Sequence, residues 1–501
     1  MKTLQIHNGD TINIRDIPVL SYDIFMDTNI SLATQAHCHC VIYFAYPTNA
    51  GLHFICCMAD DTDKTIHISS FTLDNPDTKI DSLTASHMSF HVFERDIHER
   101  YGVQFINHPW LKPVRYPTVR HNRQSSMQQY PFYHSTSEEL HEVGVGPVHA
   151  GIIEPGHFRF ICNGEQILHL EIQLGYQHRG IEELFIKKTG ILQRSALAES
   201  IAGDTVVGHS WAFTGLMESL SAYSTSEQLQ YERTVALEIE RIAVHTGDMA
   251  AICTDVAYQL GNAVLGRLRT PIINFFQRWC GNRLAKSLIR PYGCLYPFSP
   301  ALAERCLIVL DSYERDFDEI WQRINSLPSF LSRVEQCGVL TAQQILDIGA
   351  VGMTARMAGV KRDIRASHPY GQYNSVIHLP VLMQSGDVYA RTALRQKEIK
   401  QSLAYLQEWL QKMPDTAHTS SVPLEKKLKP SSFSLFMTEG WRGEICHAAI
   451  TDSEGNILSY RIKDPSMHNW TALALAVRNN EISDFPINNK SFNLSYCGFD
   501  L

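Results

Sequence analysis

The N-terminal part of the chain alternates apolar and polar residues in short runs. These runs fall near residues 4–14, 41–45, 52–58 and 65–71, and their period of two is typical of strands. A helical pattern follows from about residue 82 to residue 101. We therefore predict an α+β domain over residues 1–114.

The rest of the chain changes pattern three times. Residues 115–142 are polar, contain two prolines and lack periodicity, which is typical of a linker. Strand-like runs broken by glycine and proline turns occupy residues 146–184. From Ser224 and Glu227, which have the spacing of a capping box, the pattern becomes helical, and we expect a bundle of long helices through about residue 410. Residues 414–431 are again polar and are expected to form a long loop.

Composition narrows the class of protein. The chain has 501 residues, of which 44% are hydrophobic and 19% charged, and a net charge of -8, which is typical of a globular protein with two or three domains. No basic stripe is present, so nucleic acid is not expected as a partner. The first thirty residues lack a signal-peptide pattern and no apolar run approaches 18 residues, so we expect a cytoplasmic protein. The twelve cysteines are expected to be reduced and buried.

One run in the N-terminal part has the residue types of a metal site. His37, Cys38, His39 and Cys40 are consecutive. Alternation along a strand sends histidine and cysteine side chains to opposite faces, and no second ligand pair follows at the spacing of a zinc site. We therefore interpret the run as part of a strand and not as a metal site.

The stretch over residues 146–184 has the composition of a site. It contains three histidines, two arginines and five glutamates among its turns: His149, His157, His178, Arg159, Arg179, Glu154, Glu165, Glu171, Glu182 and Glu183. Such groups on turn-rich strands are also common as ordinary solvated surface. Composition alone leaves both interpretations open.

Four ordered motifs in this stretch carry a resemblance. GPxH, EPGHF, GE and GYxHRGIE follow one another as they do in the large subunits of energy-converting NiFe hydrogenases of the formate hydrogenlyase type. They also resemble, more loosely, the 49-kDa subunit of respiratory complex I. In both families this hairpin lines a redox pocket beside an iron–sulfur cluster of a partner subunit, so the resemblance implies a similar cavity.

Further segments extend the resemblance over most of the chain. FERDIHERYGVQFINHPWL at residues 93–111 is similar to the signature of the complex I 30-kDa subunit, and ERTVALEIERIAVH, residues 349–373 and the Arg442-Gly443-Glu444 turn resemble parts of the large subunit. The charged members of residues 349–373 are either functional or ion pairs at helix ends on the surface: Arg356, Arg362, Asp363 and Arg365. The implied fold is α+β, with a 30-kDa-like domain at residues 1–114, a linker at 115–142, and a domain like the 49-kDa and hydrogenase large subunits at 143–501, which contains a β-hairpin and a long helix bundle.

The chain departs from the hydrogenase pattern where nickel is bound. That centre requires four thiolates in two pairs, because soft sulfur ligands hold both metals. The aligned positions are Ala202, Thr205, Ser495 and Gly498, and only Cys497 lies nearby. We therefore expect no nickel and no hydrogen turnover. The pattern most resembles hydrogenase-related membrane complexes whose large subunit lacks these cysteines.

The resemblance implies an electron-transfer or coupling component of a membrane-associated oxidoreductase complex. Glu182 is the expected proton relay, because its hydrogenase counterpart transfers protons and because burial tunes a carboxylate pKa. His157 and Arg442 are the other expected catalytic residues. The residues expected to line the pocket are His149, Arg159, His178, Arg179, Ala202, Thr205, His209, Ser495 and Cys497.

The resemblance also implies partners and a location. No cofactor is expected in this chain. A 4Fe-4S cluster is expected in a small subunit like the complex I 20-kDa subunit, beside a ferredoxin-like subunit and membrane subunits of the antiporter type, at the cytoplasmic face of the inner membrane. Two alternatives stay open: a quinone-reducing subunit in which His157 binds the headgroup, and a redox-inert scaffold coupled to an antiporter-like module. GxGxxG and Walker A patterns are absent, so no bound nucleotide is expected.

Overall fold

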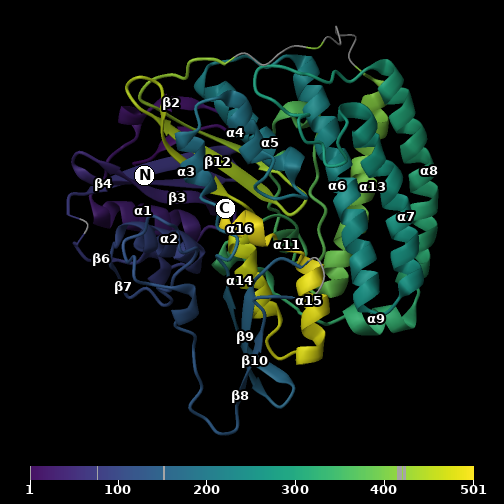
Figure 1. The fold of residues 1–501 in the computed structure, drawn as a ribbon, viewed down its shortest axis with the longest axis horizontal. Coiled ribbons are helices and arrows are strands. Elements are labelled where there is room, and N and C mark those ends of the chain that lie inside the picture. Colours follow the sequence, from purple (N-terminus) through teal and green to yellow (C-terminus); the bar gives the residue numbers. More distant parts are fainter. Residues whose placement is uncertain (1, 76, 150–152, 414–419, 421–424) are drawn as a thin grey trace.

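The computed structural model of the chain describes residues 2–75, 77–149, 153–413, 420 and 425–501. The first sheet is antiparallel and lies in the N-terminal part of the chain. Its strands have the order β1-β5-β4-β3: β1 (Leu4–Ile6), β5 (Thr65–Leu73), β4 (Gly51–Asp60) and β3 (Cys38–Thr48). Helices α1 (Tyr22–Ala33) and α2 (His91–Tyr101) pack on it (Figure 1). The α+β prediction is confirmed, although the sequence pattern did not predict α1. A small parallel pair, β6 (Ile80–Asp81) and β7 (Phe105–Ile106), flanks α2 in the chain.

The second sheet combines the two ends of the chain. Its order is β13-β12-β11-β2, with β2 (Thr11–Asn13), β11 (Ser432–Glu439), β12 (Glu444–Thr451) and β13 (Ile457–Lys463). The main-chain hydrogen bonds between β2 and β11 therefore tie the first residues to the C-terminal part. Helix α5 (Val206–Leu220) packs on β11 and β12. The division of the chain at residues 114 and 142 stays a prediction.

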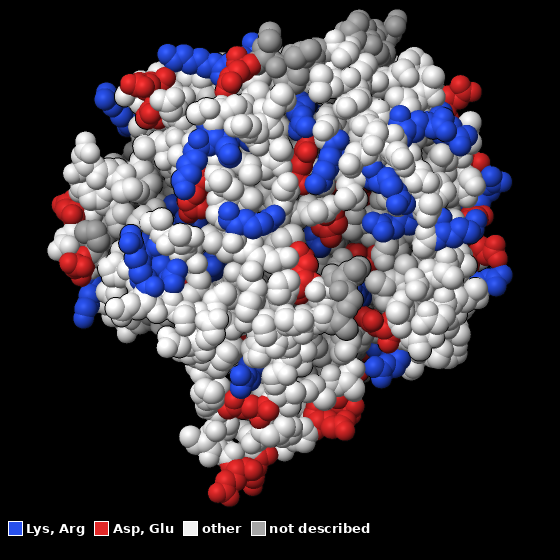
Figure 2. Space-filling view, in the orientation of Figure 1, with Lys and Arg blue, Asp and Glu red and all other residues white. Residues whose placement is uncertain are grey.

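A third sheet extends from the body of the molecule. It consists of β8 (His141–Val145), β9 (His157–Asn163) and β10 (Gln166–Gln173), and β9 and β10 form the hairpin within residues 146–184 (Figure 1). Acidic side chains gather at its tip (Figure 2). Residues 115–142 contain one 3₁₀ turn (Met127–Gln129) and the start of β8.

The helix bundle lies on the side of the molecule opposite the first sheet (Figure 1). Its long members are α6 (Glu227–Asp255), α7 (Gln259–Cys280), α8 (Pro300–Asn325) and α13 (Val388–Gln411). Two short helices, α9 (Pro328–Val334) and α10 (Ala342–Ile348), follow α8 in the chain. These helices confirm the predicted long-helix bundle. The N-cap of α6 is Ser226, whose side chain accepts the N–H of Leu229, and not the predicted Ser224. Helix α6 is buried on all sides, because other elements surround it.

Short helices connect these layers. They are α3 (Ile181–Lys187), α4 (Ile191–Ala198), α11 (Gly352–Arg356) and α12 (Ile364–Ser367). The C-terminal segment forms three helices: α14 (Ser466–Ala476), α15 (Phe485–Phe492) and α16 (Tyr496–Asp500). Most of the loop expected at residues 414–431 lies outside the described residues. Among the helices that the structure describes, none is long and apolar enough to cross a membrane.

Candidate functional site

A cavity of about 740 Å³ lies where the hairpin meets the C-terminal helices. The chain before β9, the α4–α5 loop, the end of α6, the Arg442 turn, α15 and the start of α16 all contribute to its wall. Much of the wall is apolar: Phe158, Leu284, Phe485 and Leu494. Polar groups enter it from several sides: His149, Glu154, Asp204, Arg442, Ser495 and Cys497. The arrangement suits a partly apolar ligand with one or two polar groups.

Arg442 is held rigidly in this wall. Its Nη1 and Nη2 each donate a hydrogen bond of 2.7 Å to the carboxylate of Asp204, and its Nε donates to the carbonyl of Asn493 at 2.6 Å. The guanidinium also lies 3.9 Å from the ring centroid of Trp441. Because each guanidinium nitrogen has a hydrogen-bond partner, Arg442 can present charge to the cavity without moving.

The turn that carries Arg442 depends on glycine. Gly443 has a φ of +142°, and a Cβ added there would lie 2.7 Å from the Cα of Gly352. Gly440 and Gly443 exchange backbone hydrogen bonds across the turn. A side chain at Gly443 would therefore push the turn away from α11, and Arg442 with it.

The four positions aligned with nickel ligands lie in two neighbouring segments. Arg179 joins these segments, because its Nη2 donates to the carbonyls of Ile201 at 3.0 Å and Cys497 at 3.1 Å. Ala202 and Thr205 belong to the first segment and are buried behind the cavity wall, whereas Ser495 of the second segment lies in the wall.

Both hydroxyl groups at these positions are engaged in hydrogen bonds. The Oγ1 of Thr205 accepts from Nη1 of Arg442 at 3.2 Å and from the Trp441 indole at 3.1 Å. The Oγ of Ser495 accepts the N–H of Gly498 at 2.9 Å and thereby caps α16.

Most polar residues of the predicted hairpin site hold backbone groups. The Nε2 of His149 lies 2.9 Å from the carbonyl of Gly156, and the Nδ1 of His157 lies 3.1 Å from that of Gly146. His178 contacts the carbonyl of Asp500 at 2.7 Å. Of these three, only His149 lines the cavity. Burial lowers the pKa of both His157 and His178, which favours neutral rings.

Arg159 and His209 also lie off the cavity wall. Arg159 pairs with Glu142 at 3.2 Å on the hairpin sheet. His209 is fully buried, where its Nε2 lies 3.0 Å from Asp464 and its Nδ1 lies 3.1 Å from His447. Asp464 in turn packs under α16, because a Cβ at Gly498 would lie 2.7 Å from its carboxylate.

Glu182 lies in an ion-pair cluster away from the cavity wall. Its Oε2 accepts hydrogen bonds from Arg100 at 2.7 Å and Arg461 at 3.0 Å, and its Oε1 accepts the N–H of Ile462 at 3.0 Å. Both oxygens are therefore engaged. These contacts join α2, α3 and β13, which suits a structural role.

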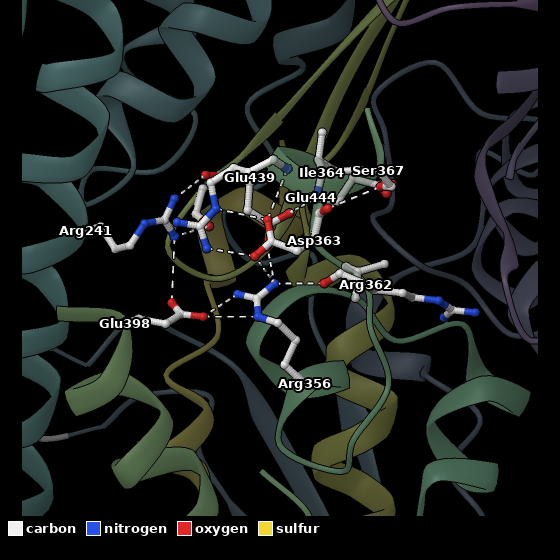
Figure 3. Close-up of polar contacts among 12 residues, drawn as sticks. Arg241, Arg356, Arg362, Asp363, Ile364, Ser367, Glu398, Glu439 and Glu444 are labelled. Carbon is white, nitrogen blue, oxygen red and sulfur yellow. Dashed lines mark hydrogen bonds and ion pairs between the residues drawn. The ribbon is translucent and has the colours of Figure 1, made fainter. Parts of the chain in front are cut away.

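A buried charge network supports the cavity from the bundle side (Figure 3). Arg356 donates to Glu439 at 2.7 Å and Glu398 at 2.6 Å, and Arg365 donates to Asp363 at 2.8 Å. Arg362, Arg356, Asp363 and Arg365 are at most 5% exposed, so the interpretation as surface ion pairs is wrong. The sequence shows charged residues near short helices, but it does not show that β11 and α13 cover these residues in the fold.

The network reaches the Arg442 turn through one side chain. Arg241 of α6 donates to the carbonyls of Glu439 at 2.7 Å and Gly440 at 3.1 Å (Figure 3). Removing a partner from such a network would leave buried charge without compensation. The network therefore holds the turn in place.

Comparison with known proteins finds two family matches along the chain. Residues 25–128 match the family model of the 30-kDa subunit of respiratory-chain NADH dehydrogenase, and residues 261–432 match that of the 49-kDa subunit. A 30-kDa-like segment and a 49-kDa-like segment are therefore fused in this one chain.

Curated relatives of this family come from hydrogenase and respiratory complexes. Hydrogenase-4 component G of Escherichia coli is 27% identical over 76% of this chain, and the match covers 65% of that relative, just under two thirds of its length. Formate hydrogenlyase subunit 5 of the same organism is 25% identical over 79% of this chain and 72% of its own. The C/D subunit of the NADH-quinone oxidoreductase of Phocaeicola vulgatus is 24% identical over 80% of this chain and 83% of its own.

The donor set at the family's metal position does not fit a four-thiolate centre. Ala202, Thr205, Ser495 and Gly498 supply no sulfur. Burial, together with the negative charge of Glu154, raises the pKa of the Cys497 thiol to about 11, so the thiol is neutral near pH 7. One neutral thiol cannot replace four soft anionic ligands.

Sequence reasoning missed several residues of the site. Asp204, Asn493 and Tyr496 carry no motif of their own, and only their position beside the ligand segments could have indicated them. Glu154 belongs to the EPGHF motif but was not expected to line the pocket. Glu240 of α6 was also missed. Its carboxyl accepts the N–H groups of Val207 at 2.7 Å and Gly208 at 3.2 Å, and it shares a small pocket with Asp204.

Proposed function

We propose that this chain is the large-subunit-like component of a membrane-associated, respiratory-type oxidoreductase complex and that its cavity takes an organic ligand or water in place of a NiFe centre. The family supports the coarse assignment. One observation carries the finer part: the two former ligand segments meet beside an apolar cavity without supplying thiolates. Redox change or ligand binding in this cavity would then be coupled to the membrane subunits, with no hydrogen produced or consumed.

The proposed partners follow from the face on which the cavity opens. Val148 and Ile153 of the segment before β9 are 87% and 49% exposed, which suits coverage by another subunit. We propose a small iron–sulfur subunit with a 4Fe-4S cluster at this face, followed by a ferredoxin-like subunit and antiporter-type membrane subunits. The chain itself would be peripheral, on the cytoplasmic face of the inner membrane.

Reduction of a quinone is the second candidate, and the shape of the cavity favours it. A quinone would supply two-electron, two-proton chemistry between an apolar wall and a polar end. His157 does not line the cavity, so His149 would take the hydrogen-bonding role that the resemblance implies for His157. Arg442 would orient a headgroup oxygen through its fixed charge.

Native purification of the tagged chain tests this proposal. We expect an iron–sulfur subunit to copurify, with about four irons per cluster. A lipid-soluble quinone in the organic extract would favour the second candidate. Antiporter-like subunits without iron would indicate the redox-inert scaffold, and a stable lone monomer would contradict the proposal.

A matched pair of variants tests the docking face. Val148→Glu should weaken copurification of the iron–sulfur subunit, because a charge replaces an exposed apolar contact at the cavity face. Ile377→Glu serves as the control, since Ile377 is 90% exposed and its segment, unlike the one that holds Val148, contributes no residue to the cavity wall. Equal copurification with both variants would place the partner elsewhere.

A further inference from the structure

Three metal-ligating side chains converge at the end of the first sheet. One ligand atom from each of His37, Cys38 and Asp60 lies within 4.8 Å of the other two. We propose that these residues form a binding site for a divalent cation that favours nitrogen and sulfur ligands, with zinc as the best match. The site lies outside the cavity described above and does not rest on the proposed function.

The backbone brings the three residues together. Cys38, the first residue of β3, is paired in register with Asp60, the last residue of β4. His37 precedes the strand, and its carbonyl accepts the N–H of Asp61 at 2.9 Å. The expectation that alternation separates His37 from Cys38 is therefore wrong, because alternation begins only within the strand.

The Asp60 carboxylate is oriented by backbone groups and also accepts a hydrogen bond from the Cys38 thiol, so a cation would replace the thiol proton between them. The Oδ1 of Asp60 accepts the N–H groups of Thr62 at 2.8 Å and Asp63 at 2.9 Å, which fixes the carboxylate. The Oδ2 faces the Nε2 of His37 at 3.6 Å, too far for a hydrogen bond. Among the residues that the structure describes, none forms a hydrogen bond with the His37 ring. The His37 side chain is 45% exposed, so a cation can reach the site from solvent.

His39, two residues after His37, differs because its ring already has a partner. The Nε2 of His39 lies 2.6 Å from the carboxylate of Glu444, and this ring is buried. Glu444 also accepts from Lys463 at 2.8 Å. His39 therefore belongs to an ion-paired cluster between the two large sheets and is not expected to ligate the cation.

The three ligand types, imidazole nitrogen, thiolate sulfur and carboxylate oxygen, favour zinc over magnesium and calcium. Nitrogen, sulfur and carboxylate oxygen are the usual zinc ligands, whereas magnesium and calcium prefer oxygen alone. A thiolate and a carboxylate neutralise the charge of Zn²⁺, and a water from solvent can complete a tetrahedral site. Zinc binds cysteine as the thiolate. Binding therefore breaks the S–H bond, forms a Zn–S bond and releases one proton to solvent.

Titration of the metal-free full chain with Zn²⁺ and Co²⁺ tests the proposal. We expect one zinc per chain from isothermal calorimetry, one proton released, and an affinity that rises about tenfold per pH unit near neutrality. Cobalt should give a thiolate-to-metal charge-transfer band. Cys38→Ser should abolish the band, and His37→Gln and Asp60→Asn should each weaken zinc binding by about 10-fold to 100-fold.

Two features keep the test decisive. His37 is partly exposed, so His37→Gln should fold normally, as circular dichroism can confirm, even if Cys38→Ser does not. Cys497→Ser is the control, because Cys497 is the one cysteine of the twelve that is not fully buried. Unchanged zinc affinity in His37→Gln, or a cobalt band lost in Cys497→Ser and kept in Cys38→Ser, would overturn the proposal.

Discussion

Most of the charged residues described above are buried and ion-paired, whereas Glu240 is buried without an ion pair among the described residues. Its carboxyl receives two backbone N–H groups at the start of α5, but no cation bonds to it among the described residues. Burial raises its pKa to about 8, although the N–H groups of Val207 and Gly208 act in the opposite direction. The charge of Asp204 raises the pKa further, and that of Arg241 lowers it. Near pH 7 the folded protein therefore holds a proton on Glu240.

This proton makes stability depend on pH. The unfolded chain releases the proton near pH 4.5 and the folded chain near pH 8, so the folded state binds more protons between these values. The free energy of unfolding should therefore fall as pH rises through this window, by about 1 kcal/mol per unit from this group. Glu240→Gln should remove that part of the slope in urea unfolding measured from pH 5 to 8. The exposed Glu319→Gln is the control, and parallel curves for the wild type and Glu240→Gln would contradict the assignment.

At the scale of elements, the periodicity of apolar residues predicted the strands and helices whose formation depends on residues close together in sequence. Strands β3, β4 and β5, the hairpin of β9 and β10, and the long helix α6 all follow from patterns within a few turns or alternations. The pairing of β2 with β11 could not be predicted, because it joins opposite ends of the chain. The burial of Arg356 and Arg365 likewise depends on elements distant in sequence. The first two motifs contribute His149, Glu154 and Phe158 to the cavity wall, but no motif indicated that the histidines of this stretch bind backbone carbonyls.

Glu182 illustrates the same limit and gives a test at this scale. Its carboxylate joins Arg100 of α2 to Arg461 of β13, so Glu182→Gln would leave two buried guanidinium groups with less compensation. We expect the free energy of unfolding to fall by roughly 2–4 kcal/mol. Glu183→Gln is a matched control, because within the described part of the chain Glu183 has an ion pair with Arg100 only, and its side chain is 30% exposed. Unchanged stability of Glu182→Gln in urea unfolding would instead favour the proton-relay role predicted from the sequence.

At the scale of the whole molecule, segments from distant parts of the chain meet at one cavity. The hairpin lies at one end, the Arg442 turn is fixed by the buried network, and the C-terminal helix is tied down by Arg179 (Figures 1 and 3). The structure thus brings together the segments that the resemblance places around a redox site. The side chains at the metal positions are an alanine, a threonine, a serine and a glycine.

The most direct test is elemental analysis of the anaerobically purified complex, together with an activity assay that measures catalysed isotope exchange between deuterium gas and water. A cavity without thiolates at Ala202, Thr205, Ser495 and Gly498 cannot hold nickel through soft ligands, and the neutral Cys497 does not compensate. We therefore predict iron from the partner subunit, nickel far below one atom per chain, and no isotope exchange above a blank without protein. Stoichiometric nickel, or exchange that depends on the complex, would contradict the account.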